Sequence, residues 1–541
     1  MPAPRTEDES RPYCSDCNRY MAKRGHRAQS GRTRYQCGSC QVSTTASVDS
    51  QHENQHIGYD PEEAAARADT LREAVRNGAN RFVITAATNN TPVDANAFRA
   101  LKNLCKDRGA HLIVIPIHYK NITLYTQNSQ NDKYWTAAVA PYLIDQSICI
   151  GPKIWVRGDI KIQATAADPL SGMAPLAGDK WAIFGHSQLS LEPIPTPQEQ
   201  LPGRMYTTGC ITRKNYSQTK AGAKAAFHHV IGALLVETQG KHCFIRQLNA
   251  DHKGHIHDIT DCYTPHVHYT KQKALSLTTG DEHVKWMTAN VLTATYTDDD
   301  SIVKVTKPGT LVRHDVLDGY AGSHHHENHY TTQYKKWFLG DANYRRELDQ
   351  VVQHINTTTP TEWECMNLLV RSNHHEHLDS WLERADDRTD HENADIICEL
   401  RNAQRQAIRA GDEYDAFRLY LEPRLEVPAE FSSPNKPYMM GGVDFSQHGH
   451  RGSGGSRGSA RGFANTTHKA TIGHTHSARI VKSVYQVGKS CDNLEYEEGL
   501  SAHTHTHSLQ YDNGKRTLLD ILGVSWRATN EPNTGNLKIE A

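Results

Sequence analysis

The segment Thr279-Gly280-Asp281-Glu282-His283-Val284 comes just after a short β-like run, Ala274–Leu277. We expect the run to be a β-strand and the segment to be the loop at its end. An Asp and a His two residues apart on such a loop can turn toward one point and offer an oxygen and a nitrogen ligand to a divalent metal. The chain has 33 histidines, so an Asp-x-His triplet also arises by chance. The motif indicates a site only if other parts of the chain supply further ligands.

Four later segments repeat the arrangement, a short apolar run that ends in residues of metal-ligand type. They are Leu311–Gly319 with Asp315 and Asp318, Leu368–His377 with Asn373 and His374, Val443–His450 with His448, and Thr471–Ser477 with His474 and His476. Loops at the carboxyl ends of strands gather at one rim of an α/β sheet, where such folds place their sites. The sequence therefore predicts a metal centre built from distant loops. The alternative is five coincidences in a histidine-rich chain.

The order Asp-x-His, Asp-x-x-Asp, Asn-His, His and Gly-His-x-His resembles the calcineurin-like metallophosphoesterases, a family of two-metal phosphatases and nucleases. The resemblance covers residues 271–486 and implies an α/β fold, a four-layer sandwich. It also implies that His374 is the general acid, oriented by Asp318. The implied ligands are Asp281, His283 and His476 for one metal, Asn373, His448 and His474 for the other, and Asp315 as the bridge between them.

Several positions depart from the family's usual pattern. His314 precedes the bridging Asp where glycine is usual, and Ser372 and His375 flank the Asn-His pair where glycine and an acid are usual. The phosphate-binding Arg that often follows the second Asp is absent, because Gly319 and Tyr320 follow directly. These departures bear more on how phosphate is held than on the metals.

The chemistry of the residues agrees with a two-metal centre. Two close cations lower the pKa of a water between them and neutralise charge on phosphoryl oxygens. The carboxylate of Asp315 can bridge two cations, Asn373 adds a neutral oxygen, and His374 can protonate a leaving alkoxide. A set of oxygen and nitrogen ligands without thiolates favours Mn²⁺, with Mg²⁺, Fe or Zn²⁺ also compatible. His450 is an alternative to His448 as a ligand.

Two C-x-x-C pairs near the start supply four thiolates for a closed tetrahedral Zn²⁺ site; they are Cys14 with Cys17 and Cys37 with Cys40. A segment of about 40 residues usually needs such a metal to fold. We therefore predict a structural zinc ribbon, with a pair of redox motifs as the alternative. Basic residues between the pairs would contact DNA phosphates, or form a solvated face: Arg24, Arg27, Arg32 and Arg34.

The rest of the sequence predicts further domains. The runs Arg81–Ala87, Ala95–Lys106 and His111–Pro116 alternate as strand, helix and strand, which indicates a βαβ unit. We expect a zinc ribbon at 1–48, a linker at 49–60, an upstream α/β accessory domain at 61–270, a catalytic domain at 271–510 with a helical insertion at 378–421 for packing or self-association, and a C-terminal tail at 511–541.

Three polar segments have two interpretations each. His503–His507 alternates as a strand would, so we expect its three histidines on an exposed face, with a metal role as the alternative. The glycine-rich loop 451–462 would hold a nucleic-acid backbone through Arg451 and Arg457, or simply be mobile. The segment Ser323–His329 would line the cleft or form a solvated loop.

Composition limits the partners. The chain has 541 residues, 60 Lys plus Arg against 61 Asp plus Glu, and a net charge of -1, so any affinity for nucleic acid must be local. No apolar run reaches the length of a signal peptide or a membrane span, and we expect no membrane partner and a cytoplasmic location.

Four fragments resemble the pre-early nucleases of some large tailed bacteriophages, a family tied to host-DNA degradation: 220–224, 311–320, 371–379 and 452–462. That resemblance implies a two-metal DNase whose partner is DNA and which acts in the cytoplasm of the host cell. We also expect a homo-oligomer. The alternatives are a phosphomonoesterase or small-molecule phosphodiesterase with the same centre, and a DNA-binding or scaffold protein with a degenerate centre.

Overall fold

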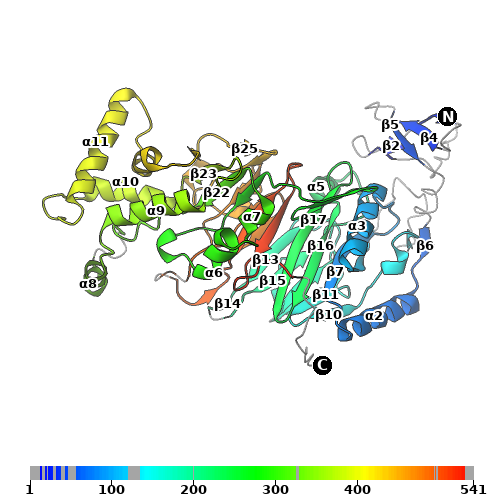
Figure 1. The fold of residues 1–541 in the computed structure, drawn as a ribbon. Coiled ribbons are helices and arrows are strands. Elements are labelled where there is room, and N and C mark those ends of the chain that lie inside the picture. The colour runs from blue at the N-terminus through cyan, green and yellow to red at the C-terminus, as the bar shows by residue number, and fades with distance from the viewer. Residues whose placement is uncertain are drawn as a thin grey trace. The chain divides into compact units, whose positions relative to one another are not determined.

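The computed structural model describes residues 13–14, 19–20, 22–27, 32–37, 43–46, 56–119, 134–178, 180–198, 200–323, 328–492, 494 and 497–529. The chain is a mixed α/β protein with several sheets (Figure 1). It divides into two compact units: unit 1 is Met1–Ser190, Arg204–Thr270 and Thr529–Ala541, and unit 2 is Leu191–Gly203 and Lys271–Ala528. Among the described residues, no helix has the length and apolar character needed to cross a membrane.

The strands nearest the N-terminus are short and antiparallel. One pair is β1 (Tyr13–Cys14) with β2 (Arg19–Tyr20), and a three-stranded sheet has the order β3 (Ala22–Arg27), β4 (Arg32–Gln36), β5 (Ser43–Ala46). Of the four predicted zinc ligands, Cys14 is on β1 and Cys37 directly follows β4 and is buried. Cys17 and Cys40 lie outside the described residues, so the zinc site stays a prediction. The four predicted DNA-contacting arginines are on β3 and β4.

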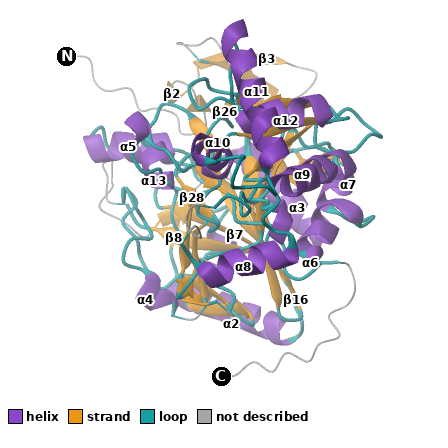
Figure 2. Ribbon diagram, turned by 90° about the vertical axis from the view of Figure 1, so that its left-hand side faces the viewer, coloured by secondary structure: helices purple, strands orange, loops and turns teal. Residues whose placement is uncertain are grey.

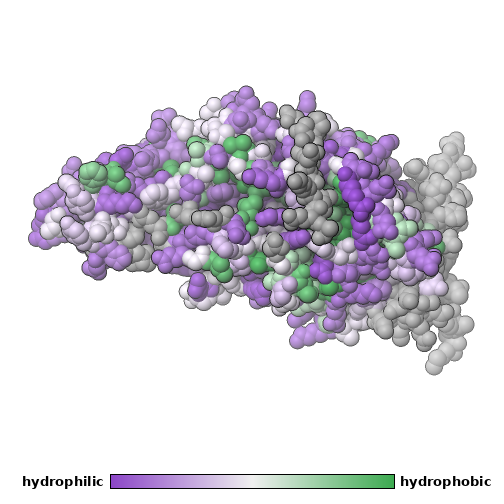
Figure 3. All heavy atoms as spheres, turned by 90° about the horizontal axis from the view of Figure 1, so that it is seen from below, coloured by the Kyte–Doolittle hydropathy of each residue, from purple (hydrophilic) through white to green (hydrophobic). Residues whose placement is uncertain are grey.

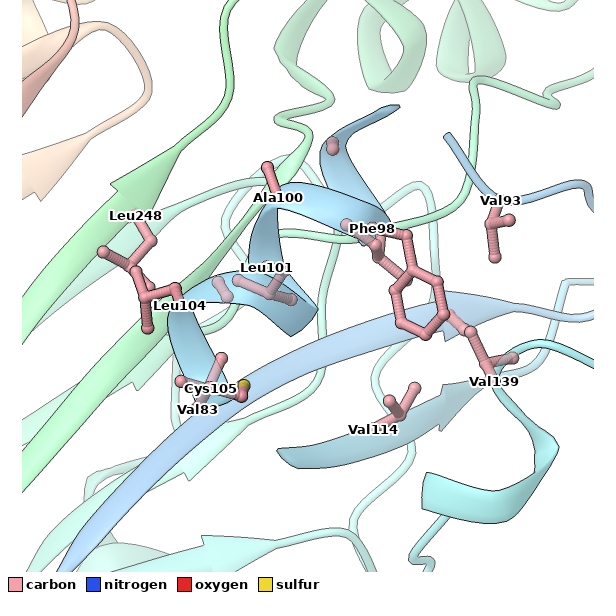
Figure 4. Packing of buried hydrophobic residues seen from close by; sticks show 14 of the residues in the cluster. Val83, Val93, Phe98, Ala100, Leu101, Leu104, Cys105, Val114, Val139 and Leu248 are labelled. Atoms are coloured by element: carbon pink, nitrogen blue, oxygen red, sulfur yellow. The ribbon is translucent and has the colours of Figure 1, made fainter. Parts of the chain in front are cut away.

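The predicted βαβ unit of unit 1 is confirmed. Strands β7 (Arg81–Thr88) and β8 (His111–Ile117) are parallel neighbours joined through α3 (Ala95–Arg108), in a sheet of order β17-β16-β7-β8. The Asp94 side chain accepts from Ala97 N to begin α3, and Gly109 ends it at φ 61°. Figure 4 shows how α3 buries Phe98, Leu101 and Leu104 against the sheet.

Unit 1 contains one further long helix, α2 (Pro61–Arg76), and a number of shorter elements. The shorter helices are η1 (Ala140–Tyr142), α4 (Ala174–Ala177) and α5 (Lys220–His228). The strands are β6 (His56–Gly58), β9 (Tyr134–Thr136), β10 (Ser147–Gly151), β11 (Ile154–Arg157), β12 (Trp181–Phe184), β15 (Gly203–Thr207), β16 (Gly232–Gln239), β17 (His242–Asn249), β18 (Ile256–Asp258), β19 (Asp261–Tyr263) and β20 (His268–Tyr269).

Unit 2 contains a six-stranded mixed sheet. Its order is β24 (Ala429–Phe431), β23 (Met366–Val370), β22 (Thr310–His314), β21 (Ser276–Thr278), β31 (Thr506–Gln510), β32 (Arg516–Asp520). The first four strands are parallel, and β31 and β32 are antiparallel to their neighbours. We expected a tail from residue 511, but β32 is the edge strand of this sheet and unit 2 extends to Ala528.

A second group of strands in unit 2 packs on the first sheet. Their order is β28 (Arg479–Val481), β29 (Val484–Gln486), β27 (Lys469–Ile472), β26 (Val443–Asp444), β25 (Met439–Met440). Val312 and Leu368 of the first sheet share a buried cluster with Val443 and Phe445, so these two sheets meet face to face. Strands β13 (Ser190–Ile194), β14 (Thr196–Pro197) and β30 (Leu500–Ser501) complete the set.

Helices cover the outer faces of both sheets. Leu369 of β23 points away from Val443 and packs with α9 (Tyr344–Thr358), α10 (Asn373–Arg384), α11 (Ala394–Ala410) and α12 (Ala416–Leu421). On the second sheet, α13 (Ala460–Phe463) packs on Ala470 and Ile472. The predicted helical insertion thus contributes to the core, although Ile408 of α11 is 57% exposed. The short helices are η2 (Val284–Trp286), α6 (Ala289–Leu292), η3 (Thr293–Thr297), α7 (Ile302–Thr306), α8 (Tyr330–Leu339), η5 (Glu422–Arg424) and η6 (Ser453–Gly455).

The helix α8, visible in Figure 2, has an unusual distribution of side chains. Lys336 is its one buried residue, and its Nζ donates to the carbonyl oxygen of Tyr320 at 2.5 Å. The large apolar residues of the helix are exposed instead: Tyr330, Tyr334, Trp337, Phe338 and Leu339. Much of the remaining surface is hydrophilic, as the face in Figure 3 shows.

Two buried histidines of unit 1 make its stability depend on pH. His229 donates from Nε2 to Thr212 O at 2.9 Å and accepts at Nδ1 from Tyr216, also at 2.9 Å. Burial lowers the pKa of His229 to about 3 and that of His186 to about 4. The unfolded chain takes up these protons near pH 6.5 and the folded chain does not, so folding loses stability as pH falls from about 6.5 toward 4.

We expect His229→Gln to make the free energy of unfolding less dependent on pH. Removing one such group should reduce the slope between pH 6.5 and 4.5 by up to about 1.4 kcal/mol per pH unit. Urea titrations at several pH values measure this slope, and the exposed His252 provides the matched variant His252→Gln. An equal slope in both variants would contradict the assignment.

Candidate metal centre

The predicted ligands follow the ends of strands that point the same way. Strands β21, β22 and β23 are parallel, as are β26 and β27, so the loops after them meet at one edge. The structure brings together Asp281, His283, Asp315 and His476, whose ligand atoms all lie within 4.8 Å of one another and which are all buried.

The first group of ligands surrounds the Nε2 atom of His476. That atom lies 3.2 Å from Nε2 of His283 and 3.4 Å from Oδ2 of Asp281. His283 Nε2 in turn lies 3.8 Å from Oδ2 of Asp315. Four side chains from three loops thus point to one place.

The second group of predicted ligands includes His448, which also lies close to Asp315. Oδ2 of Asp315 is 3.0 Å from Nε2 of His448, and the rings of His448 and His474 have centroids 5.3 Å apart. Asn373 is the first residue of α10, and its Oδ1 is buried with no hydrogen-bond partner among the described residues. Oδ2 of Asp315 therefore lies near a histidine of each predicted ligand set, His283 and His448.

The donor set fits divalent cations. Among the described residues, the Oδ1 atoms of Asp281, Asp315 and Asn373 are buried and make no hydrogen bond. Each such orphaned group costs about 1–3 kcal/mol unless something binds it. Carboxylate, amide and imidazole ligands without thiolates suit Mn²⁺ and also Mg²⁺, Fe and Zn²⁺.

The pKa shifts of the carboxyl and imidazole groups in the centre also agree with a cation site. Burial and then the charge of Asp315 raise the pKa of Asp281 well above its usual value. Burial also raises the pKa of Asp315, but nearby imidazoles, His448 first, outweigh it and hold that pKa well below its usual value. Burial lowers the pKa of His474 to about 4 and of His476 to about 3, so both are neutral at pH 7, as metal ligation requires.

Four of the predicted ligands have a left-handed backbone. The φ angles are 37° at His283, 44° at Asp315, 77° at His474 and 57° at His476. For residues other than glycine this conformation costs on the order of 1–3 kcal/mol each, and it persists where the surroundings impose it. Contacts within the site hold this backbone in place, because His283 N donates to Asp315 O at 2.7 Å. The loop that carries His474 also packs tightly on Asp281, since a Cβ on Gly473 would lie 2.2 Å from Asp281 Oδ1. Strained backbone of this kind is concentrated at functional sites.

Asp318 contacts His374 through its main-chain oxygen and not, as the predicted orienting role would suggest, through its carboxylate. His374 donates from Nδ1 to the main-chain oxygen of Asp318 at 2.6 Å, while the Asp318 carboxylate lies 4.0 Å away. That carboxylate accepts from His283 Nδ1 at 2.9 Å and from Trp286 Nε1 at 3.1 Å. Burial lowers the pKa of His374, but the charges of Asp315 and Asp318 outweigh it, so the pKa is raised. His374 can therefore carry a proton in the centre.

Two acidic residues that the sequence did not single out support the ligands. Glu282 is buried and accepts from Arg313 Nη1 at 3.1 Å and from His354 Nε2 at 2.9 Å. Glu497 accepts from His476 Nδ1 at 3.0 Å and from Lys489 Nζ at 2.7 Å. The carboxylate partner of a ligating histidine fixes its tautomer and direction, so Glu497 orients His476.

The histidine run at 503–507 differs from the exposed strand that we expected. Strand β31 begins at Thr506, and His507 is fully buried because β31 lies inside the six-stranded sheet. His507 accepts at Nδ1 from Gly280 N at 2.9 Å and donates from Nε2 to Thr295 at 2.8 Å. His503 lies beside Glu497, with His503 Nδ1 and Oε2 at 3.2 Å. The run thus supports the loop that carries Asp281.

Other predicted residues lie apart from Asp315. His450 has Nε2 3.5 Å from Glu376 Oε2, so His448 and not His450 faces Asp315. Arg451 donates to the same Glu376 carboxylate at 2.5 Å, and both Arg451 and Arg457 are exposed. Most of the segment 323–329 lies outside the described residues.

Comparisons with known proteins give one extended similarity. No protein-family model matches the chain. Protein A1 of Escherichia phage T5 is 29% identical over 477 residues, which is 85% of each chain. The crystal structure of Chaetomium thermophilum Vps29 aligns with 35% of this chain and 99% of its own, at 13% identity and a TM-score of 0.18, which is too low to support an argument. The chain is therefore similar to a phage protein over most of its length.

Proposed function

We propose that the chain is a two-metal-dependent DNase of a bacteriophage that hydrolyses phosphodiester bonds in host DNA. The observation that carries the proposal is that Oδ2 of Asp315 lies 3.8 Å from Nε2 of His283, in the group with Asp281 and His476, and 3.0 Å from Nε2 of His448. The similarity to a phage protein supports the viral source. We propose Mn²⁺ as the metal, and the calcineurin-like four-layer sandwich as the fold of unit 2.

The residues of the chain have separate tasks in this proposal. Metals bound by these ligands would act as Lewis acids toward water and the phosphoryl oxygens. His374 would donate a proton to the leaving oxygen, held in place by the carbonyl of Asp318. The Asp318 carboxylate holds His283 Nδ1, which directs Nε2 of that ring toward His476 and Asp315.

The N-terminal segment has a supporting role in the proposal. We propose that Cys14, Cys17, Cys37 and Cys40 hold one structural Zn²⁺. The basic residues of β3 and β4, with Arg451 and Arg457, would contact the DNA backbone. The buried position of Cys37 supports the zinc site.

A comparison of three substrates tests the proposed activity. We expect EDTA-treated protein with added Mn²⁺ to cut supercoiled plasmid and bis-p-nitrophenyl phosphate, and to be inactive without metal. Faster turnover of p-nitrophenyl phosphate, a monoester, would instead indicate a phosphomonoesterase. Mn²⁺ binding without turnover of any of the three would indicate a scaffold protein.

We also propose that copies of the chain associate through α8. Its exposed aromatic residues include Tyr334, which lies 5.7 Å from Trp337 and 6.4 Å from Phe338 between ring centroids. Exposed aromatic clusters of this kind mark interfaces more often than free surface.

We expect Trp337→Ala with Phe338→Ala to lower the mass of the assembly, as light scattering after size-exclusion chromatography would measure. The double variant Thr331→Ala with Lys335→Ala changes the exposed polar residues of the same helix and serves as the control. An unchanged mass in the aromatic variant would exclude α8 as the interface.

A further inference from the structure

His314 lies directly beside the proposed metal centre. It is the last residue of β22 and is fully buried, and its carbonyl accepts from Glu282 N at 2.9 Å. Gly473 leaves room for the ring, since a Cβ there would lie 3.3 Å from Cγ of His314. Ligand atoms of His314, Asp281 and His448 all lie within 4.8 Å of one another.

The ring of His314 contacts a second imidazole. Nδ1 of His314 lies 3.2 Å from Nδ1 of His448, and the two rings are tilted by 36°. Two nitrogens at this distance share one hydrogen, so one ring donates and the other accepts. The contact therefore fixes the tautomers of the two rings together.

The atom that Nε2 of His448 binds determines which ring donates. Nε2 lies 3.0 Å from Oδ2 of Asp315, so without a cation it donates to that carboxylate, and with a cation bound it gives up this hydrogen. A histidine that binds a metal through Nε2 carries its hydrogen on Nδ1 and donates it to a neighbouring acceptor. For His448, the neighbour that the described residues supply is Nδ1 of His314.

We propose that His314 is a positioning residue of the metal centre: it accepts the Nδ1 hydrogen of His448 and so presents the Nε2 lone pair of His448 to the metal beside Asp315. This inference rests on the two-metal function proposed above. It adds to the centre an imidazole that acts through His448, and it makes the affinity for one of the two metals depend on a residue of β22.

The test measures metal binding by the full-length protein. We expect isothermal titration of EDTA-treated wild type with Mn²⁺ to show two sites. His314→Phe fills a similar volume without an acceptor, and it should weaken one site by about 10- to 100-fold. His314→Asn places an amide oxygen near the position of Nδ1, and it should keep both affinities within about 3-fold of wild type. The variant His186→Phe removes a buried histidine of unit 1 and should leave both sites unchanged.

The possible results test the role of His314 and the two-metal function separately. If His314→Phe does not fold, as judged by circular dichroism, His314→Gly replaces it, since the smaller residue removes the acceptor without crowding. Wild-type affinity at both sites in the Phe or Gly variant overturns the inference, as does a loss in His314→Asn equal to that in His314→Phe. A wild type that binds fewer than two Mn²⁺ overturns the two-metal function itself, and this inference with it.

Discussion

Replacement of Asp315 by Asn is expected to abolish plasmid cleavage in the presence of Mn²⁺ while leaving DNA binding intact. Oδ2 of Asp315 lies 3.0 Å from Nε2 of His448 and 3.8 Å from Nε2 of His283, so one carboxylate serves both ligand groups. A neutral amide cannot bridge two cations in the same way. Two-metal centres contribute several kcal/mol to stabilising the transition state, so kcat should fall by at least about a thousandfold.

The measurement pairs an agarose-gel cleavage assay with a binding assay on the same plasmid. The matched control is Asp412→Asn, because Asp412 is an exposed carboxylate in the loop before α12. The control should cut DNA at the wild-type rate. Cleavage by Asp315→Asn at that rate would remove the bridging role and the proposed activity together.

His374→Ala is expected to slow DNA cleavage by about 10²- to 10⁴-fold, the usual contribution of a general acid. Its Nδ1 donates to Asp318 O at 2.6 Å, which leaves Nε2 to deliver a proton. A p-nitrophenolate leaves without being protonated, so hydrolysis of bis-p-nitrophenyl phosphate should fall much less. This difference between substrates separates proton donation from a general loss of structure.

The pH profile gives a second readout for His374. Its pKa is raised above the usual 6.5, and the protonated form is the active one, so the wild-type rate on DNA should fall as pH rises through that pKa. The variant should lack this limb. His391→Ala, at an exposed position before α11, is the control. An equal loss on both substrates in His374→Ala would contradict the proposed proton donation.

The candidate ligands can be predicted from sequence because each one follows a short β-compatible run. Leu311–Val312 and Leu368–Val370 are strand interiors, and the polar residues that come after them have to lie at the sheet edge. The order of the motifs along the chain then matches the order of loops around that edge. At these positions the residue that follows a strand in the sequence also lies at the sheet edge in the fold, so the sequence pattern predicts the position of the residue.

The supporting residues cannot be found in that way. Glu497 lies in a polar loop with no periodic pattern, and its contact with His476 depends on two loops meeting in space. The prediction for His503–His507 is wrong because alternation of His and Thr is typical of an exposed strand. In the structure β31 is enclosed between β21 and β32, so the histidine of that strand is buried and serves as a hydrogen-bonding residue.

The left-handed backbone at the candidate ligand residues lowers the stability of the folded chain where the proposed activity resides. At Asp315, φ is 44°, a conformation that asparagine tolerates better than most residues and glycine adopts freely. Selection for thermal stability alone would therefore favour asparagine or glycine at position 315, and either residue lacks the carboxylate that the proposed activity needs.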